Sequence, residues 1–430
     1  MATLDTPAAI RDLQRALYLR TKRDARFRAY ALYDKVYRPD ILAHAYTLAK
    51  ANGGAPGPDG VTFAAIEQDG PAALLGALHE ALKMKTYRPG PVRRVYIPKV
   101  SGGERPLGIP NIRDRVVQTA AKLLLEPIFE ADFEPDSFGF RPHRSAHDAL
   151  DAIRAALAAG MCWVIDADVT AYFDTIPHDR LMQTVATRVV DGAMLALIKQ
   201  FLEAPVVDDR GDGRPRRPRR GTPQGGVISP LLANVYLHLL DRNFRRHVVR
   251  GALHGRLIRY ADDFVLLTRR RPTAEWAWLH RLMGKLGLTL HPEKTRMLDA
   301  GRTAFVFLGH THRWQGQRLY LDVSPKALTR IRSEIRRRTQ RPQASLPQTI
   351  AVLNRYIDGA RQYFRRVRRR TLSKLDTFVD SRVARWSARK HHQRWPDWPL
   401  VARDRLRRQH GLHRWNLPAT LRPVDARRAR

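Results

Sequence analysis

The 430-residue chain contains a single cysteine, Cys162. An intramolecular disulfide and a cysteine-cluster zinc site are therefore excluded, and so sparse a use of cysteine fits a reducing compartment. No apolar run approaches the roughly 20 residues that a membrane-spanning helix needs. The start, Met1 to Asp5, also lacks the basic and apolar regions of a signal peptide. We therefore expect a cytoplasmic protein with no membrane partner.

Acidic residues are the second scarcity. Asp and Glu number 41 against 77 Lys and Arg, which gives a formal charge of +36 at pH 7. A surplus this large indicates a polyanionic partner. Residues 326–430 alone hold 29 basic and 7 acidic residues. Such a run is often a solvated face or a tail, but the aromatic residues interleaved with it at helical spacings favour a folded nucleic-acid-binding surface.

Two adjacent carboxylates, Asp262 and Asp263, lie inside an apolar stretch that runs from Leu257 to Leu267. Asp is a poor strand residue, and buried charges are tolerated mainly when they are paired or coordinate a metal. The pattern predicts a hairpin that holds a metal ion near its tip. The alternative is an ordinary hairpin whose Asp residues lie in an exposed turn.

A second acidic segment upstream favours the metal. Trp163–Val169 (WVIDADV) has the composition of a buried strand, and the two-residue side-chain period puts Asp166 and Asp168 on one face. Two-metal chemistry on phosphates needs oxygen ligands that converge from separate elements around ions roughly 3.5–4 Å apart. Magnesium suits carboxylates combined with substrate phosphates. Asp168 is the better candidate ligand, whereas Asp166 also fits a structural cap or ion pair.

The chain is long enough for about three domains. From Trp163 to about Leu321, the pattern alternates strands with helices, and from Ser324 it becomes helical and basic. Further elements are expected as helices over 1–50, 63–84, 112–133 and 146–158 and as a strand over 92–98.

Five short segments follow one another along the chain and carry the most specific signal. They are Arg105–Pro110 (RPLGIP), Phe138–Pro142 (FGFRP), Asp168–Phe173 (DVTAYF), Gly221–Pro230 (GTPQGGVISP) and Tyr260–Asp263 (YADD). In this order they resemble the motifs of reverse transcriptases encoded by group II introns, over about residues 11 to 395. One such segment alone is weak evidence, but the ordered series is specific.

The resemblance implies an α+β fold of the right-hand polymerase type. Its parts are fingers, a palm with an antiparallel sheet and packed helices, and an α-helical thumb. The expected ranges are an N-terminal helical extension of the fingers over 1–60, fingers over 61–160, palm over 161–322, thumb or maturase domain X over 323–395, and a basic C-terminal extension over 396–430 that could bind DNA.

By the same resemblance, Asp168, Asp262 and Asp263 are the catalytic carboxylates. Asp168 and Asp262 would be the principal ligands of two Mg²⁺ ions, or of Mn²⁺ in their place, with the Val169 carbonyl and Asp263 as further ligands. Phe173 would lie under the incoming sugar and reject a 2′-hydroxyl. A core phenylalanine at a strand end is the alternative for Phe173.

The resemblance also implies residues that bind the nucleotide. Lys99 and Arg105 flank a glycine-containing loop and would grip the triphosphate, although in so basic a chain either also fits simple surface charge. Gln224 would help to seat the templating base, with a tight turn before a helix as the alternative. Lys294 would lie near the triphosphate and could protonate the leaving pyrophosphate.

Past the palm, Leu353–Phe364 resembles the maturase region that grips intron RNA. The chain departs from the family there, because Ala360 stands where Trp is common and Gln362 where Asn is common. A basic helical bundle that only packs on the palm is the alternative. Residues 391–430 contain no cysteine pairs, so we expect no His-Asn-His-type endonuclease. The arginines expected to bind nucleic acid are Arg141, Arg144, Arg365, Arg366, Arg368 and Arg369.

The function expected from this resemblance is RNA-directed DNA synthesis. The partners would be an RNA template or intron RNA, a DNA primer or target DNA, and dNTPs, and the protein would also aid group II intron splicing and retrohoming. Two alternatives stay open: an intron-independent enzyme of this type recruited to defence or repair, and an RNA-binding splicing factor whose polymerase site is vestigial.

Overall fold

The computed structural model describes residues 5–98, 103–211, 213–315, 318–340, 343–390 and 406–416. The chain divides into two compact units, Met1–Leu298 and Asp299–Arg430. Within the described ranges, every helix is too short or too polar to cross a bilayer.

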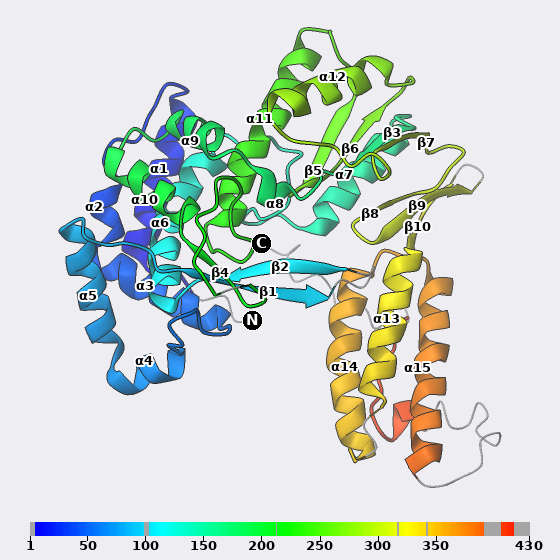
Figure 1. Cartoon of the computed structure of the whole chain (residues 1–430). Coiled ribbons are helices and arrows are strands. Elements are labelled where there is room, and N and C mark those ends of the chain that lie inside the picture. The colour runs from blue at the N-terminus through cyan, green and yellow to red at the C-terminus, as the bar shows by residue number, and fades with distance from the viewer. Residues whose placement is uncertain are drawn as a thin grey trace. The chain divides into compact units, whose positions relative to one another are not determined.

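The first unit combines helices with two small sheets (Figure 1). Its helices are α1 (Ala8–Arg23), α2 (Tyr33–Val36), α3 (Pro39–Asn52), α4 (Phe63–Asp69), α5 (Pro71–Lys83), α6 (Ile112–Glu130), α7 (Ala146–Ala158), α8 (Tyr172–Thr175), α9 (His178–Ala186), α10 (Gly192–Leu202), α11 (Ser229–Val249) and α12 (Thr273–Lys285). The helices expected at 112–133 and 146–158 are therefore present.

Helix α6 forms the centre of this unit, where it packs against α1, α2, α3 and α5. Buried residues occur on nearly all its sides, and the apolar ones include Val117, Ala121 and Leu124, which are fully buried. A helix with so much buried surface is stable only inside a core. Its one buried acid, Asp114, accepts hydrogen bonds from the Tyr87 hydroxyl at 2.7 Å and the Gly90 amide at 2.9 Å.

The four-stranded sheet of the first unit carries the acidic segments. Its strand order is β5 (Arg256–Tyr260), β6 (Asp263–Thr268), β3 (Trp163–Ala167) and β7 (Arg296–Asp299). Strands β5 and β6 form the expected hairpin, and β3 pairs antiparallel with β6. Because β6 lies between two strands inside the core, its apolar run is buried on both faces of the sheet.

A three-stranded sheet in the same unit has the order β2 (Glu104–Ile109), β1 (Val92–Pro98), β4 (Val206–Asp208). Strands β1 and β2 are antiparallel, and β1 and β4 are parallel. The loop between β1 and β2 contains Lys99, which lies outside the described residues.

The second unit consists of a three-stranded sheet followed by helices. The elements are β8 (Phe305–Phe307), β9 (His310–Gln315), β10 (Arg318–Val323), α13 (Pro325–Arg338), α14 (Leu346–Tyr363) and α15 (Arg369–Lys390). Helix α13 packs against both α14 and α15, as Figure 1 shows. Their shared core includes Ile331, Leu353 and Val379. This compact unit begins at Asp299, upstream of the residue 323 at which we expected the thumb to start.

Local sequence explains where the helices of the second unit begin. The side chains of Ser324 and Ser345 accept hydrogen bonds from the first-turn amides of Ala327 and Gln348. In the reverse direction, the Ser345 amide donates to the Gln348 side-chain oxygen. Such caps satisfy amides that have no partner inside the helix.

The buried side chain of His312, on β9, leads us to expect a measurable loss of stability in acid. Its ring stacks on Phe305 at 4.7 Å, and neither ring nitrogen has a hydrogen-bond partner among the described residues. Burial, and then the charge of His310, lowers the pKa of His312 to about 3. The unfolded chain, with a His pKa of about 6.5, takes up the proton first, so stability is full above that pH and falls as the pH drops toward the folded pKa.

Between about pH 7.5 and 5.5, His312 should therefore lower the free energy of unfolding by about 1.4 kcal/mol. Urea unfolding at the two pH values measures this, and His312→Phe should remove that part of the pH dependence. Substituting the exposed His410 is the control. An unchanged pH dependence in His312→Phe would contradict the prediction.

Candidate active site

Asp168, Asp262 and Asp263 meet at one end of the four-stranded sheet. Ala167 of β3 pairs with Phe264 of β6, so Asp168 continues the register one step to the level of Asp263. Neighbouring strands lie about 5 Å apart. Asp262 belongs to the turn between Tyr260 and Asp263, which pair with each other at the end of the hairpin. The structure thus brings together carboxylates that are nearly 100 residues apart in sequence.

Electrostatics at this end of the sheet favours a cation. Burial raises the pKa of Asp262, and the charge of Asp168 raises it further. Asp263 keeps an exposed edge, yet desolvation of its carboxyl, followed by the charges of Asp262, Asp168 and Asp166, raises its pKa to about 7. Like-charged carboxylates that are partly desolvated favour proton uptake or a metal ion. Their oxygen atoms suit magnesium, so the residues fit the expected ions.

The side chains as they lie do not yet form a coordination sphere. No group of three His, Cys, Asp or Glu side chains within the described ranges is arranged to hold a metal ion. Instead, Lys294 Nζ lies 2.8 Å from Asp168 Oδ2. Lys294 therefore lies at the end of the sheet where the three carboxylates meet, and its contact is with Asp168.

The backbone around Asp168 is held by the segment that carries Lys294. The amide of His291 donates to the Asp168 carbonyl at 2.8 Å, and the amide of Thr170 donates to the Thr289 carbonyl at 2.9 Å. Val169, between them, is buried opposite Leu290. Asp166, on the same face of β3, forms an ion pair with Arg296 at 3.3 Å, which is the structural alternative considered for this residue.

Phe173 lies in the short helix α8, which follows β3 and Asp168 in the chain. It is 5% exposed and its ring lies edge-on to Phe140, with centroids 6.3 Å apart. Phe140 itself is 51% exposed. Phe173 therefore belongs to the core while contacting a ring that faces solvent, a position that leaves both of its expected roles open.

Arg105 and Gln224 meet beside Asp262. The Arg105 Nε atom donates to Gln224 Oε1 at 2.6 Å, and the charge of Arg105 offsets part of the rise in the pKa of Asp262 that burial causes. The turn that carries Gln224 docks on β2 through a bond from the Gly108 amide to the Gln224 carbonyl. Gly225 has φ +109°, and a Cβ there would lie 2.3 Å from the Gly108 carbonyl oxygen. Only glycine allows this close approach.

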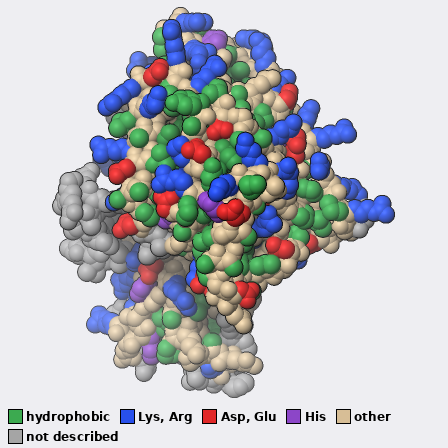
Figure 2. All heavy atoms as spheres, turned by 90° about the vertical axis from the view of Figure 1, so that its left-hand side faces the viewer, with side chains coloured by type: hydrophobic (Ala, Val, Ile, Leu, Met, Phe, Trp, Pro, Cys, Tyr) green, Lys and Arg blue, Asp and Glu red, His purple; other side chains and the backbone are tan. Residues whose placement is uncertain are grey.

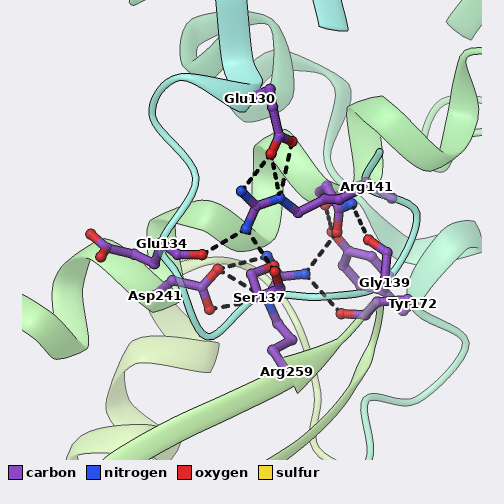
Figure 3. Close-up of polar contacts among 11 residues, drawn as sticks. Glu130, Glu134, Ser137, Gly139, Arg141, Tyr172, Asp241 and Arg259 are labelled. Carbon is purple, nitrogen blue, oxygen red and sulfur yellow. Dashed lines mark hydrogen bonds and ion pairs between the residues drawn. The ribbon is translucent and has the colours of Figure 1, made fainter. Parts of the chain in front are cut away.

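A buried ion pair supports the hairpin turn, and sequence analysis did not identify it. Arg259 on β5 is fully buried and binds both carboxylate oxygens of Asp241 on α11, the shortest contact being 2.6 Å. Its other terminal nitrogen donates to Asn234 Oδ1 at 2.8 Å and to the Ala261 carbonyl at 2.9 Å. Figure 3 shows Arg259 pointing toward Asp241. The available signal was an arginine inside the apolar run before the acidic pair.

The Ala261 carbonyl needs such support because its residue is strained. Ala261 has φ +57°, a conformation that costs a non-glycine residue about 1–2 kcal/mol. Gly139 presses against this turn, since a Cβ on it would lie 2.2 Å from the Ala261 amide nitrogen. The Asn234 side chain donates to the Gly139 carbonyl at 2.7 Å. Arg259 and Asn234 thus tie the turn, the loop at Gly139 and α11 together.

Arg141 is buried, and its guanidinium serves the same loop. It pairs with Glu130 at 2.6 Å and donates to the carbonyls of Glu134 and Ser137 (Figure 3). In this arrangement Arg141 is not available to a nucleic acid, contrary to our expectation from sequence. Arg144 is exposed and lies over the Phe138 ring at 5.7 Å.

The other expected nucleic-acid-binding arginines lie in the second unit, in the connection from α14 to α15 and at the first residue of α15. Arg366 and Arg369 are exposed and Arg365 is half-buried. Arg368 instead forms an ion pair with Asp322, which also accepts a bond from Thr371 at 2.7 Å. This hydrogen-bonded contact raises the pKa of Arg368. Arg368 therefore joins α15 to β10.

Two known families match successive parts of the chain. Residues 97–312 match the family of reverse transcriptase (RNA-dependent DNA polymerase), and residues 328–409 match the group II intron, maturase-specific domain.

Individual relatives agree. Protein YkfC of Escherichia coli (strain K12) is 36% identical over 338 residues, which cover 70% of this chain and 87% of that protein. The group II intron-encoded protein LtrA of Lactococcus lactis subsp. cremoris is 39% identical over 219 residues, or 49% of this chain and 34% of LtrA. An uncharacterized 91 kDa protein in the cob intron of Schizosaccharomyces pombe is 34% identical, over 64% of this chain and 40% of that protein.

These matches confirm the α+β right-hand polymerase fold that the motifs predicted. This chain spans about a third of LtrA, so LtrA as a whole is not a guide to every activity of this protein. The chain belongs to the reverse transcriptases, RNA-directed DNA polymerases, of the group II intron-encoded type that also carry a maturase-specific domain.

Proposed function

We propose that this protein copies RNA into cDNA by nucleotidyl transfer at the site formed by Asp168, Asp262 and Asp263. The observation that carries the proposal is the convergence of these carboxylates at one end of the sheet, where burial and mutual repulsion raise the pKa of Asp262 and Asp263. Asp168 and Asp262 would be the principal ligands of two magnesium ions, with the Val169 carbonyl and Asp263 as further ligands. When bound, such ions lower the pKa of the primer 3′-hydroxyl and neutralise charge on the triphosphate.

The surrounding residues bind and orient the substrates in this proposal. Arg105 and Lys99 hold the triphosphate, because guanidinium and ammonium groups suit a ligand with several negative charges. Gln224 accepts a hydrogen bond from Arg105 and helps to seat the templating base, so it connects the residues that bind the triphosphate with those that position the template. Phe173 lies under the sugar of the incoming nucleotide and excludes a 2′-hydroxyl.

Lys294 has a distinct part in the proposal. Its ammonium group, now 2.8 Å from Asp168, exchanges this contact for the triphosphate when the nucleotide arrives. From there it donates a proton to the leaving pyrophosphate.

The proposed fingers comprise residues 61–160 with a helical extension over 1–60, the palm 161–322 and the thumb 323–395, followed by a basic extension. We further propose that the thumb grips intron RNA, and that the protein aids splicing and retrohoming of a group II intron. The match of residues 328–409 to the maturase-specific domain supports this role. Intron RNA structure on both sides of the coding sequence would support it further, and its absence would favour an intron-independent enzyme.

The defining experiment is extension of oligo(dT) on poly(rA), with and without magnesium. Magnesium-dependent incorporation of dTTP supports the proposal. A protein that binds RNA but extends no primer would instead be an RNA-binding factor with a vestigial site.

The thumb arginines give a second test, on binding. Arg365→Gln, Arg366→Gln and Arg369→Gln together should weaken RNA binding and flatten its dependence on salt. Removing one phosphate contact lowers the slope of log K against log salt by about 0.7–0.9, so the triple substitution should lower it by about 2. Fluorescence anisotropy across a salt series measures the slope.

Arg368 is left out of the thumb variant because its pairing with Asp322 gives it a structural role. Arg368→Gln is the matched control: it should lower thermal stability with little change of slope. An unchanged slope in the triple variant would remove these arginines from the binding surface.

A further inference from the structure

The first unit contains a large cleft away from the catalytic carboxylates. It has a volume of about 930 Å³ and is lined by the connection between α1 and α2, the end of α6 and the loop after it, α9 and α11. None of the residues assigned above to catalysis or to nucleotide binding lines it.

Basic charge alone does not mark a site in this protein. Figure 2 shows Lys and Arg side chains spread over the face that it presents, with acidic side chains among them. The cleft is distinguished because many of its arginines form no ion pair among the described residues. Arginine is the most frequent residue in its lining, and Asp132 and Glu134 are the acidic residues there.

Both acids of the cleft already have partners. Asp132 pairs with Arg188 through two contacts of 2.6 Å, and Glu134 pairs with Arg245 at 3.0 Å. Arg188 also donates to the carbonyls of Ala25 and Phe27 at 2.9 Å. It therefore holds the α1–α2 connection in place as one wall of the cleft.

Five further arginines line the cleft: Arg26, Arg28, Arg242, Arg246 and Arg250. Among the described residues, no hydrogen bond and no ion pair within 4.0 Å engages the guanidinium group of any of them, although the backbone amide of Arg26 donates to Asp24 Oδ1 at 2.8 Å. Partial burial, and then the charge of Arg246, lowers the pKa of Arg242, and the charges of Asp132 and Glu134 offset only part of this lowering. Arg242 and Arg246 therefore repel each other, and the two acids compensate Arg242 incompletely.

The arrangement of these arginines suits a chain of anions. Arg242, Arg246 and Arg250 follow at intervals of four residues at the end of α11, so they lie along one side with a rise of about 6 Å per step. Arg26 and Arg28 face them from the α1–α2 connection. The helix dipole favours cations in the last turn, but it accounts neither for Arg242, two turns from the end, nor for Arg26 and Arg28.

The lining offers little for base recognition. Among the described lining residues there is no Tyr or Trp, and Phe129, the phenylalanine, is 4% exposed. Bases of single strands are usually held by stacking on exposed rings, whereas phosphates are held by arginine and lysine irrespective of sequence. A mononucleotide would neutralise only part of five cations.

We propose that this cleft is a second nucleic-acid site, which binds consecutive phosphate groups of an RNA backbone outside the polymerase site. The inference rests on the proposed function in one respect, the choice of RNA as the polyanion. The site holds a structured RNA in place while the template strand passes the catalytic carboxylates.

The test replaces three arginines of the cleft. Arg242→Gln, Arg246→Gln and Arg250→Gln together should weaken binding of a labelled hairpin RNA about tenfold to hundredfold at about 0.1 M salt, and lower the salt slope by about 2. The matched control replaces the exposed Arg269, Arg270 and Arg271, which removes the same charge elsewhere in the unit. The control should change affinity less than about threefold. Equal losses in the two variants would overturn the proposal.

Two further measurements distinguish an RNA-backbone site from a folding role and from a small-anion site. Because Arg242 and Arg246 repel each other and the three guanidinium groups form no ion pair among the described residues, the cleft variant should melt at the same or a higher temperature than the unaltered protein. A lower melting temperature together with weaker binding would assign these arginines to folding and overturn the proposal. Inorganic phosphate and dTTP serve as free-anion probes. A cleft variant that loses affinity for these probes but keeps its affinity for RNA would show a small-anion site and likewise overturn it.

The same preparations separate this inference from the proposed function. Oligo(dT) extension on saturating poly(rA) should stay within about twofold in the cleft variant, because the polymerase site is untouched. Absence of extension in the unaltered protein counts against the proposed function alone. The RNA affinity of the cleft variant decides the cleft.

Discussion

Asp262→Asn should abolish magnesium-dependent primer extension while leaving RNA binding nearly intact. The substitution keeps the size of the side chain and removes its charge. A metal ion at such a site supplies several kcal/mol of transition-state stabilisation, and each 1.4 kcal/mol is about a factor of ten in rate. We therefore expect a loss of roughly 10³-fold or more in the rate of dTTP incorporation.

The folding stability of Asp262→Asn and its affinity for RNA can both be measured independently of its reaction rate. Since burial and Asp168 disfavour the charged form of Asp262, the amide should leave the metal-free protein equally stable or more stable. Asp166→Asn is the matched control. Asp166 lies on β3, the strand that leads to Asp168, but it forms an ion pair with Arg296. If Asp262→Asn loses primer extension and RNA affinity to the same degree, the Asp262 carboxylate is structural. If Asp166→Asn loses as much activity as Asp262→Asn, Asp166 must be counted among the metal ligands.

Arg259→Met should cost both stability and activity. Removing one partner of a buried ion pair leaves the other charge uncompensated, which destabilises proteins by about 3–5 kcal/mol. Here the uncompensated group is Asp241, which is 6% exposed. The substitution also removes the donor to the Ala261 carbonyl, so the turn before Asp262 loses a support. A displacement of about 1 Å at a catalytic group can cost about 100-fold in rate.

A double variant separates the two effects of Arg259. Arg259→Met with Asp241→Leu removes the uncompensated charge and should recover most of the stability, whereas kcat should stay low because no donor reaches Ala261. Denaturant unfolding and primer extension measure the two quantities. If the double variant recovers kcat together with stability, Arg259 acts only through folding and the positioning role is wrong.

Arg256→Met is the matched control for Arg259→Met. Arg256 is on the same strand and pairs with Asp136 at 2.6 Å, but both side chains are partly exposed. Solvent screening reduces such pairs to about 1 kcal/mol or less, so we expect a small loss of stability and little change of kcat.

The features of the active site that local sequence encodes were predictable. The strand at Trp163 and the hairpin at Asp262 follow from alternation and apolar runs, which depend on neighbouring residues. The convergence of Asp168 with Asp262 and Asp263 followed from the order of the motifs together with the need of buried carboxylates for a cation. The helix caps at Ser324 and Ser345 are likewise local.

The partners of charged side chains were not predictable in this way. Arg141 stands in a motif and in a basic chain, yet it is buried against Glu130. Arg368 lies among exposed arginines, yet it binds Asp322. In both cases a single carboxylate within reach decides between a structural and a nucleic-acid-binding arginine, and composition does not indicate where that carboxylate lies.

The amino-acid sequence by itself determined that this chain is a basic, RNA-directed polymerase with acidic residues set into apolar strands, because periodicity, charge and motif order are properties of the chain alone. Tertiary structure decided which groups meet: Lys294 with Asp168 across 126 residues, Arg105 with Gln224 across 119, and, around a cleft, arginines that form no ion pair among the described residues. The physical reason is that the energy of a charge depends on its burial and on its nearest opposite charge, and both are set by residues distant in sequence.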